Sequence, residues 1–507
     1  MPDKYLLASD LGSGGCKTVI LNNQGRIISS ASTEYPTYYP HPSWVEQNPD
    51  DWYQALAQTT RRAISEAGIS STEIAMVGLV GVTHNTVLLD SNDRPLRNCI
   101  LTFDQRSEVQ CRQILARWGD EVLNQTRNGV SPLWSWPQLL WLKQNEPDTW
   151  QATRRLLFQK DYVRHRLAPA YVTDTVDAAG TLLFNPVTET WVEAFIDDVG
   201  VSPAMLPQVV GPMEVVSEIS RPAARDTGLA PGTPVIAGTT DTVAEVFGSG
   251  LLQPGQGLVK LASVGRLAVI ANGPVHHPNI LNYRHVLDGL WYPGSGTKAA
   301  ATTPRWLRDN LWRGQRPADA PTFAQMDEAA AGIQPGSEGL LFQPHLLGEW
   351  APYWDEHLRA NFIGATMRHT RAHFTRAALE GVAFSLRDAI EGLARIGLQY
   401  QEYRLIGGGA KSGLWAQIVS DVLGQELLLP RQQDAAYGAA LITAVAAGLL
   451  DISPASIREV IQLEARLQPD PDHHAIYNEL FEIYQAAERK LADIAHRLSA
   501  FEQNADR

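Results

Sequence analysis

The chain has 507 residues, with 42 basic and 55 acidic side chains and a net charge of -13. At roughly 150 residues per domain, this length predicts two large domains or three smaller ones. Hydrophobic residues make up 44% of the chain and charged residues 19%, which is typical of a globular protein and excludes wholesale disorder. The acidic balance argues against nucleic acid as a partner, because a nucleic-acid surface needs concentrated basic residues.

Cysteine content and hydropathy indicate the compartment. The three cysteines, Cys16, Cys99 and Cys111, match no disulfide framework or zinc motif, which favours a reducing environment. The N-terminus carries early charges and only a short apolar stretch, unlike a signal peptide. An uncharged stretch at 435–450 is rich in Ala and Gly and too short to span a bilayer, so it predicts a buried, closely packed helix. We expect a cytoplasmic protein that handles a small molecule and has no membrane partner.

The first 89 residues predict a β-meander, then a helix, then two more strands. The expected strands are 5–9, 16–22, 26–33, 74–79 and 86–89, and turn residues separate the first three. Residues 51–67 predict the helix, because Trp52, Leu56 and Ile64 fall on one helical face.

A related pattern occurs near the middle of the chain. A strand at 234–237 enters the turn 238–241, a helix is expected at 242–247, and two hairpin strands follow at 257–262 and 266–271. Both halves place a strand and a turn with Gly, Ser/Thr and Asp beside a β-hairpin. This weak internal repeat predicts two similar α/β domains that face each other across a cleft and join near 248–254.

The last third is predicted to be more helical. Helices are expected at 373–396, 414–423 and 474–498, and a strand at 403–406. The helix 474–498 has an apolar stripe from Tyr477 to Leu498, and core packing is a more common use of such a stripe than binding a partner.

The segment Asp10-Leu-Gly-Ser-Gly-Gly-Cys-Lys17 is a glycine-rich turn whose residues are candidates for binding phosphate or a metal ion. It is not a P-loop, because Cys16 stands directly before the lysine and the turn leads into a strand. Its backbone N–H groups could face phosphate oxygens, with Lys17 supplying charge. Asp10 could hold Mg²⁺, which prefers carboxylate and water oxygens. The alternative is a tight hairpin that needs glycine, with Asp10 as its cap.

The turn Gly238-Thr-Thr-Asp241 places a carboxylate at the start of a helix. One interpretation is an N-cap, for which both Asp and Thr are common. The other is a general base that takes a proton from a hydroxyl during phosphoryl transfer, a reaction that depends on positioning, a metal and charge stabilisation.

Two further segments are candidate binding sites. The three glycines that begin 407–412 would let the backbone approach a planar base or a phosphate, and the spacing does not fit a Rossmann fingerprint. Three consecutive polar residues, Thr83, His84 and Asn85, lie between apolar strands and could line a polyol pocket. A lone histidine is more often structural, which is the alternative for His84.

Together these segments resemble the FGGY family of carbohydrate kinases, and most of all its xylulose kinase branch. The similar blocks are Asp10-x-Gly12-Ser13 with Lys17, 44–49 with Trp52, 103–106, 160–162, 173–180, 339–344, 348–355, 364–381, 407–412 with Trp415 and Asp421, and 438–440. The resemblance covers nearly the whole chain. Each block alone is a weak signal, but so many in the right order indicate membership.

The resemblance implies two actin-like ATPase (ribonuclease H-like) α/β domains with an interdomain active-site cleft, at 1–248 and 249–507 with the terminal helix 474–498. It implies an ATP-dependent kinase for a ketopentose, most of all D-xylulose. By the resemblance, Asp241 is the catalytic base and also contacts the sugar, and Asp10 assists Mg²⁺ and contacts the substrate. Thr83, His84 and Asn85 would also contact the sugar. A homodimer is a family-level expectation.

The resemblance also implies a set of nucleotide-binding residues. They are Gly12, Ser13, Lys17, Gly265, Arg266, Gly408, Gly409, Ala410 and Ser412.

Three departures from the xylulose kinase pattern put the exact substrate in doubt. Val80-Gly-Val-Thr-His-Asn85 stands in place of Ser-Gly-Gln-Met-His-Gly, and Gln138 in place of a common lysine. Arg266 replaces the threonine of a Gly-Thr-Ser turn, where a guanidinium could bind phosphate or an acidic sugar, or point away. This leaves open a gluconate or other sugar-acid or polyol kinase, and a weakly active sugar sensor on the same fold.

Overall fold

The computed structural model describes residues 4–312 and 320–505, and its chain divides into two compact α/β units. Unit 1 comprises Met1–Leu252, Asn272–Tyr292 and Gln432–Gln462; unit 2 comprises Gln253–Ala271, Pro293–Arg431 and Leu463–Arg507. The first segment of unit 1 ends close to the boundary expected at residue 248. The sequence did not predict the two later segments that return to unit 1.

Unit 1 is built on a mixed sheet in the order β13-β14-β5-β1-β2-β3, with β15 also paired to β5. Its strands are β1 (Tyr5–Leu11), β2 (Gly15–Leu21), β3 (Ile27–Glu34), β5 (Ile74–Gly81), β13 (Val215–Glu218), β14 (Pro234–Ile236) and β15 (Thr239–Thr240). β1, β2 and β3 form the predicted antiparallel meander, whereas β5 is parallel to β1 and to β14. Buried residues fill β1 almost continuously, as expected for a strand covered on both faces.

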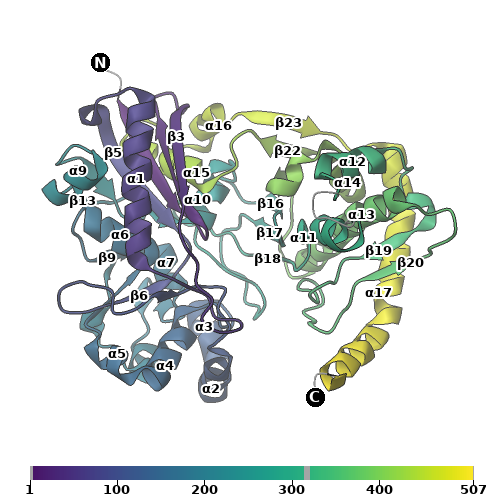
Figure 1. Cartoon of the computed structure of the whole chain (residues 1–507), viewed down its shortest axis with the longest axis horizontal. Coiled ribbons are helices and arrows are strands. Elements are labelled where there is room, and N and C mark those ends of the chain that lie inside the picture. The colour runs from purple at the N-terminus through teal and green to yellow at the C-terminus, as the bar shows by residue number, and fades with distance from the viewer. Residues whose placement is uncertain (1–3, 313–319, 506–507) are drawn as a thin grey trace. The chain divides into compact units, whose positions relative to one another are not determined.

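Different helices cover the two faces of this sheet. Leu7 and Leu11 share a core with Trp52 of α1 (Pro49–Ala67), which crosses the sheet in Figure 1. Gly78 faces the opposite way, and a Cβ there would lie 2.0 Å from Oγ1 of Thr443 in α15 (Ala435–Ala446). Because side chains alternate along a strand, the even-numbered residues of β1 point toward α15.

The predicted close-packed helix at 435–450 is confirmed as α15. It crosses α10 (Asp241–Gly248) at a very short separation, since a Cβ on Gly438 would lie 1.8 Å from the carbonyl oxygen of Ala244. Only glycine fits at this crossing, which explains the composition of the stretch.

Smaller elements complete unit 1. The short strands are β4 (Glu46–Gln47), β6 (Thr86–Leu89), β7 (Cys99–Ile100), β8 (Arg155–Phe158), β9 (Val172–Asp174), β10 (Phe184–Asn185), β11 (Thr190–Trp191) and β12 (Gln208–Val210). The remaining helices are α2 (Glu108–Trp118), α3 (Glu121–Thr126), α4 (Ser135–Asn145), α5 (Pro147–Ala152), α6 (Gln159–Leu167), α7 (Thr175–Ala179), α8 (Glu193–Val199), α9 (Arg221–Thr227) and α16 (Pro454–Val460).

Unit 2 repeats the sheet plan of unit 1. Its order is β18-β17-β16-β21-β22-β23, with an antiparallel meander β16-β17-β18 and parallel pairs β16·β21 and β21·β22. The strands are β16 (Gln256–Leu261), β17 (Gly265–Val269), β18 (Gly294–Thr297), β21 (Glu402–Ile406), β22 (Leu427–Pro430) and β23 (Leu463–Leu467), and β19 (Leu341–Gln343) pairs with β20 (Asn361–Ile363). The internal repeat and the two α/β domains predicted from the sequence are confirmed.

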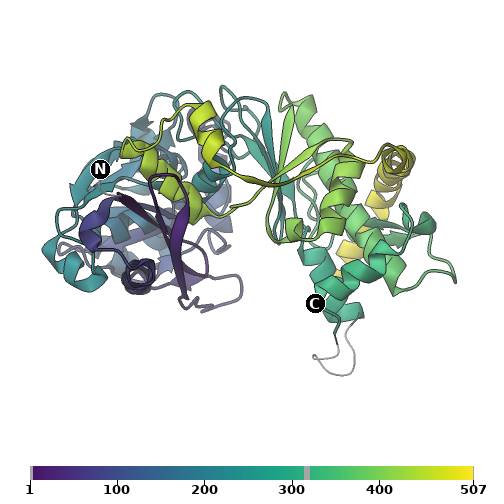
Figure 2. The same cartoon turned by 90° about the horizontal axis from the view of Figure 1, so that it is seen from above.

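The helices of unit 2 are layered on this sheet. They are α11 (Thr302–Trp306), α12 (Phe323–Ala331), α13 (Arg371–Arg395), α14 (Gly413–Leu423) and α17 (Pro471–Ala505). In Figures 1 and 2, α13 and α14 lie between the sheet and α17.

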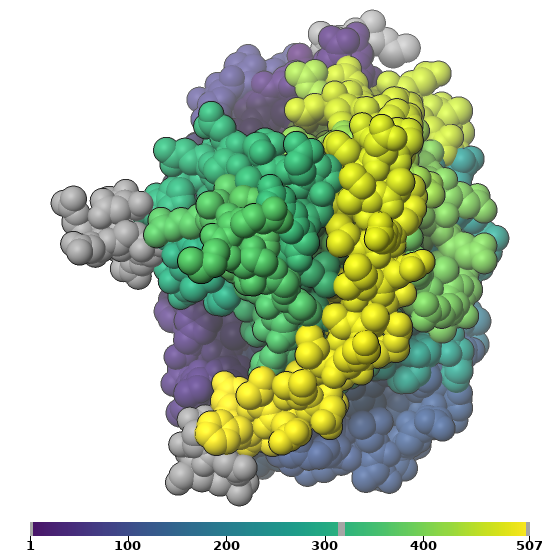
Figure 3. All heavy atoms as spheres, turned by 90° about the vertical axis from the view of Figure 1, so that its right-hand side faces the viewer, coloured from purple at the N-terminus to yellow at the C-terminus, as the bar shows by residue number. Residues whose placement is uncertain are grey.

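The stripe on α17 is only partly core. Tyr477, Phe481 and Tyr484 are buried, whereas Ile494 and Leu498 are 49% and 54% exposed. Figure 3 shows α17 running along the surface of unit 2. The prediction of core packing is therefore wrong for Ile494 and Leu498, because helical periodicity does not reveal how far the neighbouring surface extends. Within the described ranges, no helix is both long and apolar enough to cross a bilayer.

Candidate active site

The carboxylate of Asp10 lies near the end of β1, on the face of the sheet that α15 covers. The residue is partly exposed, but its Oδ1 is buried and has no hydrogen-bond partner among the described residues. Burial raises the pKa of Asp10 well above its ordinary value, and the charges of Asp241, Asp434 and Glu245 raise it further against a smaller lowering by Lys17. The side chain of Asp10 therefore lies in a negative electrostatic environment.

The residues around Asp10 fit a magnesium ion. An unsatisfied carboxylate oxygen in a negative environment would gain from a hard cation, and Mg²⁺ needs only one or two carboxylates because water and phosphate supply its other ligands. A dedicated metal cage is absent, since the described residues contain no group of three or more Cys, His, Asp or Glu suited to an ion.

The glycine-rich turn is closed by its own backbone and by two side chains from outside it. The Gly12 N–H donates to the Gly15 carbonyl at 3.0 Å, the Tyr35 hydroxyl donates to the Gly12 carbonyl, and Gln47 Nε2 donates to the Ser13 carbonyl at 2.7 Å. Ser13 itself is exposed. These bonds engage carbonyl groups, so they hold the turn without using the Ser13 N–H.

Lys17 lies opposite Asp10 in the β1·β2 register, but its ammonium pairs with another carboxylate. Its Nζ lies 2.9 Å from Oδ2 of Asp434, and the two side chains are 38% and 33% exposed. Asp434 also caps α15 by accepting from the Tyr437 N–H. The pair ties the hairpin to the return segment of unit 1, and its exposure leaves the lysine accessible to an anion.

Asp241 is the first residue of α10, and the structure shows which residue caps this helix. The N-cap is Thr240, whose hydroxyl accepts from the Val243 N–H at 3.4 Å. The Asp241 Oδ1 accepts from the Thr242 N–H at 2.6 Å and from the Thr242 hydroxyl at 3.1 Å. The helix therefore does not depend on Asp241 as its cap.

His84 has strained backbone and a buried, neutral ring. Its φ is 50°, in the left-handed region that non-glycine residues seldom adopt. Burial lowers the pKa of the imidazole to about 3, and Nδ1 has no hydrogen-bond partner in the part of the chain that the structure describes. The ring lies 4.9 Å from that of Trp134 between centroids. A neutral imidazole with an unsatisfied nitrogen is suited to bind a sugar hydroxyl.

The neighbours of His84 differ in what they offer. Thr83 and Asn85 are both buried. The Asn85 amide accepts from the Thr102 N–H at 2.9 Å and donates to Gln159 Oε1 at 3.2 Å, so the fold itself uses both of its ends.

The remaining predicted site residues lie in unit 2. Gly265 begins β17, and a Cβ there would lie 2.5 Å from the Thr297 hydroxyl. The Nη1 of Arg266 donates to the Ser295 carbonyl at 3.3 Å, while its Nη2 is buried and has no hydrogen-bond partner among the described residues.

The glycine triplet of unit 2 forms a tight corner between β21 and α14. Gly407 has a φ of 97°, and a Cβ on Gly409 would lie 2.6 Å from the Trp415 ring, so packing requires both. Gly408 faces open space, which leaves its backbone approachable. Ala410 is buried, and Ser412 caps α14 by accepting from the Trp415 N–H at 3.0 Å.

Sequence reasoning missed several residues that shape the unit 1 site. Trp134 lies beside His84, and Tyr283 lies next to Trp134, with 6.2 Å between the centroids of the Trp134 and Tyr283 rings. Tyr283 reaches this place because the Asn282 N–H donates to Asn128 Oδ1 at 2.8 Å and docks the segment 272–292. No local pattern signals such a long-range bond. Gln47 lies in a block noted for its family resemblance, and that block was the available signal.

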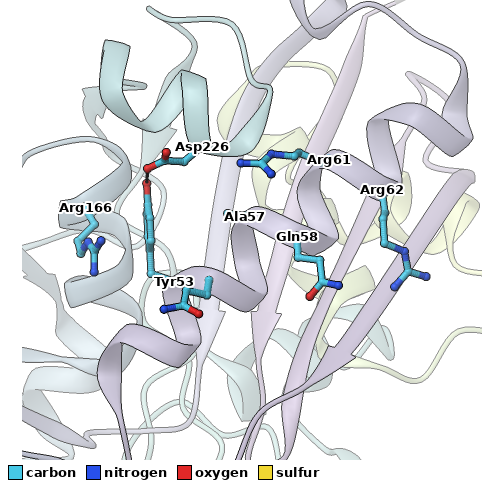
Figure 4. A pocket seen from close by; sticks show the side chains of 8 residues that line it. Tyr53, Ala57, Gln58, Arg61, Arg62, Arg166 and Asp226 are labelled. Atoms are coloured by element: carbon cyan, nitrogen blue, oxygen red, sulfur yellow. Dashed lines mark hydrogen bonds between the residues drawn. The ribbon is translucent and has the colours of Figure 1, made fainter.

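An open groove of about 570 Å³ lies on another part of unit 1. Figure 4 shows residues of α1, α6 and α9 around it, with the Tyr53 hydroxyl donating to Asp226 at 3.0 Å. Arg166 lies over the Tyr53 ring at 4.1 Å. None of the predicted site residues lines this groove.

Comparison with known proteins identifies the family. Residues 5–248 match the N-terminal domain of the FGGY family of carbohydrate kinases, and residues 270–447 match its C-terminal domain. The chain belongs to the FGGY family. The predicted class of enzyme, a sugar kinase, is confirmed, and such an enzyme takes a sugar and ATP as substrates.

The relatives of this FGGY kinase include xylulose kinases and gluconokinases. The xylulose kinase of Bacillus subtilis is 30% identical over 99% of this chain and 100% of its own length. The gluconokinase of the same organism is 28% identical over 95% of this chain and 94% of its own. The crystal structure of xylulose kinase from Rhodospirillum rubrum has a TM-score of 0.89 at 26% identity, covering 97% of this chain and 100% of that one. The predicted actin-like fold class is confirmed.

Proposed function

We propose that this FGGY kinase transfers the γ-phosphoryl group of ATP to the terminal hydroxyl of a ketopentose, D-xylulose first, with Asp241 as general base. The observation that carries the proposal is the place of Asp241 at the start of α10, where Thr240 provides the cap. The xylulose kinase relatives that align with nearly the whole chain support the choice of sugar.

The proposed step moves one proton and one phosphoryl group. The sugar oxygen attacks the γ-phosphorus as its proton passes to the Asp241 carboxylate. The bond between the γ-phosphorus and the bridging oxygen breaks, and ADP leaves with the electron pair. Asp241 is suited to this role because its carboxylate accepts hydrogen bonds from the Thr242 N–H and the Thr242 hydroxyl, which orient it at the start of α10.

Other residues of unit 1 bind and orient. We assign the sugar to His84, Thr83 and Asn85 together with Asp10 and Asp241, and His84 would contribute a neutral hydrogen-bonding nitrogen. Of these residues, Asn85 contributes by holding the backbone at Thr102 and the side chain of Gln159 in place, because its amide oxygen and nitrogen already bond to those two residues.

We assign the phosphates of ATP to the exposed turn at Gly12 and Ser13 and to Lys17. In unit 2 we assign the nucleotide to Gly408, whose backbone faces open space, and to its neighbours Gly265, Arg266, Gly409, Ala410 and Ser412. Mg²⁺ would be held by Asp10, and when bound it neutralises charge on the phosphates.

The first experiment is a coupled assay of ADP release over ketopentoses, polyols and aldonic acids. Turnover with D-xylulose well above that with the other sugars is the expected result. Absence of turnover on every compound would contradict the kinase proposal and favour the sugar sensor.

The second candidate function is a gluconate kinase. The buried Nη2 of Arg266 and the gluconokinase relative favour it, because a guanidinium is well suited to a carboxylate. A clear preference for an aldonic acid in the same panel would support this candidate and contradict the xylulose assignment.

The variant Asp241→Asn tests the base directly. It keeps the shape of the side chain but cannot accept the proton, so kcat should fall by about 10²–10⁴-fold. Sugar affinity, measured by calorimetry, should change little. Asp120→Asn is the control, because Asp120 stands at the start of α3 and makes no capping bond. Near-normal turnover of Asp241→Asn would show that the base is another group.

A further inference from the structure

A buried lysine lies behind the candidate sugar residues. Lys160, in the first turn of α6, places its Nζ 2.7 Å from Asp161, 2.8 Å from Asp174 and 2.9 Å from Asp177. All four side chains are at most 2% exposed. Arg164 adds a second buried cation, 3.3 Å from Asp161. Three carboxylates thus converge on one ammonium in the interior of unit 1.

One carboxylate of this cluster holds the strained backbone of His84. The Oδ1 of Asp177 accepts from the His84 N–H at 2.8 Å, while its Oδ2 binds Lys160. The His84 carbonyl accepts from the hydroxyl of Ser135 at 2.9 Å. A residue with a φ of 50° persists only where its surroundings impose that conformation, and these bonds hold the peptide units on both sides of His84.

A second carboxylate reaches the strand that leads to Asp241. The Oδ1 of Asp174 accepts from the Thr239 hydroxyl at 3.2 Å, and its Oδ2 lies beside Lys160. Thr239 belongs to β15, which pairs with the end of β5 and is followed at once by α10. Asp241 is only two residues beyond Thr239, so a shift of Thr239 displaces the carboxylate.

A cluster of this kind is costly to bury and need not add to stability. Apolar side chains could fill the same space, but they could not hold a backbone N–H and a hydroxyl through two arms of one ammonium. We propose that Lys160 is a positioning residue of the kinase, which sets the sugar-binding His84 through Asp177 and the base Asp241 through Asp174 and Thr239. This inference rests on the proposed function of those two residues.

Because the two arms lead to different groups, their loss should have different kinetic signatures. Thr239→Val removes one hydroxyl at nearly constant volume and misplaces the base, so kcat should fall on the order of tenfold to a hundredfold while the sugar KM changes little. Thr239→Ser restores the hydroxyl and should recover most of kcat. Thr227→Val is the matched control, because Thr227 is equally buried and, among the described residues, its hydroxyl bonds to Ala223 of the same helix, α9, and to the Leu229 N–H.

Asp177→Ala tests the other arm. The change leaves the two cations Lys160 and Arg164 with the two carboxylates of Asp161 and Asp174, so the buried charges become balanced and the chain should fold. The His84 N–H loses its acceptor, and the sugar KM should rise about tenfold with a smaller change in kcat. Asp177→Asn keeps an acceptor oxygen and should recover most of the affinity.

The readouts separate the possible failures. If the wild type turns over no sugar, the proposed function fails, whatever the variants do. If the wild type is active but Thr239→Val and Asp177→Ala match Thr227→Val in kcat and KM, the cluster is structural and the positioning role is wrong. Equal losses of kcat and KM in both variants would also contradict the two-arm assignment. The expected result is a fall in kcat for one arm and a rise in sugar KM for the other.

Discussion

Each unit buries a cluster of charges, but the two clusters are neutralised by different cations. In unit 1 the cation is Lys160, a permanent charge among three aspartates. In unit 2 it is His345, whose ring nitrogens contact Glu349 at 3.2 Å and Glu488 at 2.5 Å. The first cluster joins the neighbouring elements α6, β9 and α7, whereas the second ties α17 to the loop before Glu349.

The difference appears in which group changes its pKa. In unit 1 burial, only partly offset by the Lys160 ammonium, raises the pKa of Asp177 to about 7. In unit 2 burial would lower the pKa of His345, but hydrogen bonds and charges from Glu349 and Glu488 prevail and raise it to about 9. Both clusters bury more carboxylates than permanent cations. In unit 1 the raised pKa lets Asp177 take up a proton, and in unit 2 the raised pKa keeps His345 protonated.

Removing the permanent cation should have the largest effect. Lys160→Met keeps the length of the side chain but leaves three buried carboxylates with only Arg164, so the free energy of unfolding should fall by about 3–5 kcal/mol. Urea denaturation checks this. Adding Asp177→Asn should recover part of the loss, since it removes one of the uncompensated charges. A loss below about 1 kcal/mol would show that water or a shifted proton already neutralises the cluster.

Removing the titratable cation should cost less. His345→Leu leaves Glu349 and Glu488 without their shared partner, but Glu349 still accepts from the N–H groups of Lys298 and Trp350 and from Ser385. We expect a loss of about 2–3 kcal/mol at pH 7, measured by the same denaturation.

His496→Leu is the control for this variant. It removes a histidine that contacts Asp355 on the surface of the same unit and is 48% exposed, so it should cost less than about 1 kcal/mol. Equal losses in the two variants would contradict the role of burial in the His345 cluster.

The smallest effects should appear in the pH dependence of the unfolding midpoint. The raised pKa of Asp177 contributes stability that is full below about 4 and is lost as pH rises through about 7. The raised pKa of His345 contributes stability that is full below about 6.5 and is lost as pH rises through about 9. Asp177→Asn should remove the lower step and His345→Leu the upper one. A variant that keeps its own step would show that another group titrates there.

The elements of the sheet meanders could be predicted because their signals are local. Short apolar strands separated by glycine-rich turns predict the antiparallel strands β1–β3 and the hairpin β16–β17, whereas β18, which follows the segment 272–292 of unit 1, was not predicted. The placement of Asp241 directly after a short strand and at the start of α10 was predictable for the same reason, since Gly238 and two threonines mark the turn. The helix α15 was predictable from its small, uncharged residues.

The contacts that complete the site could not be predicted in this way. Docking of the segment 272–292 depends on a bond between Asn282 and Asn128, and the ends of that bond are far apart along the chain. The convergence of Asp174 and Asp177 on Lys160 is likewise invisible in the sequence, where the blocks could be noted but not joined. Ile494 and Leu498 of α17 are exposed because the neighbouring elements do not cover them. The helical spacing of these residues gives no information about what covers them.

The sequence by itself determined the repeated α/β plan, the family and the residue types available for chemistry, because turns, periodicity and motifs are properties of short segments. Only the tertiary structure decided that Thr240 caps α10 in place of Asp241, that His84 is buried and neutral, and that Lys17 forms an ion pair with Asp434. The physical reason is that burial and charge pairing depend on the surroundings of each group in space, and long-range packing supplies those surroundings.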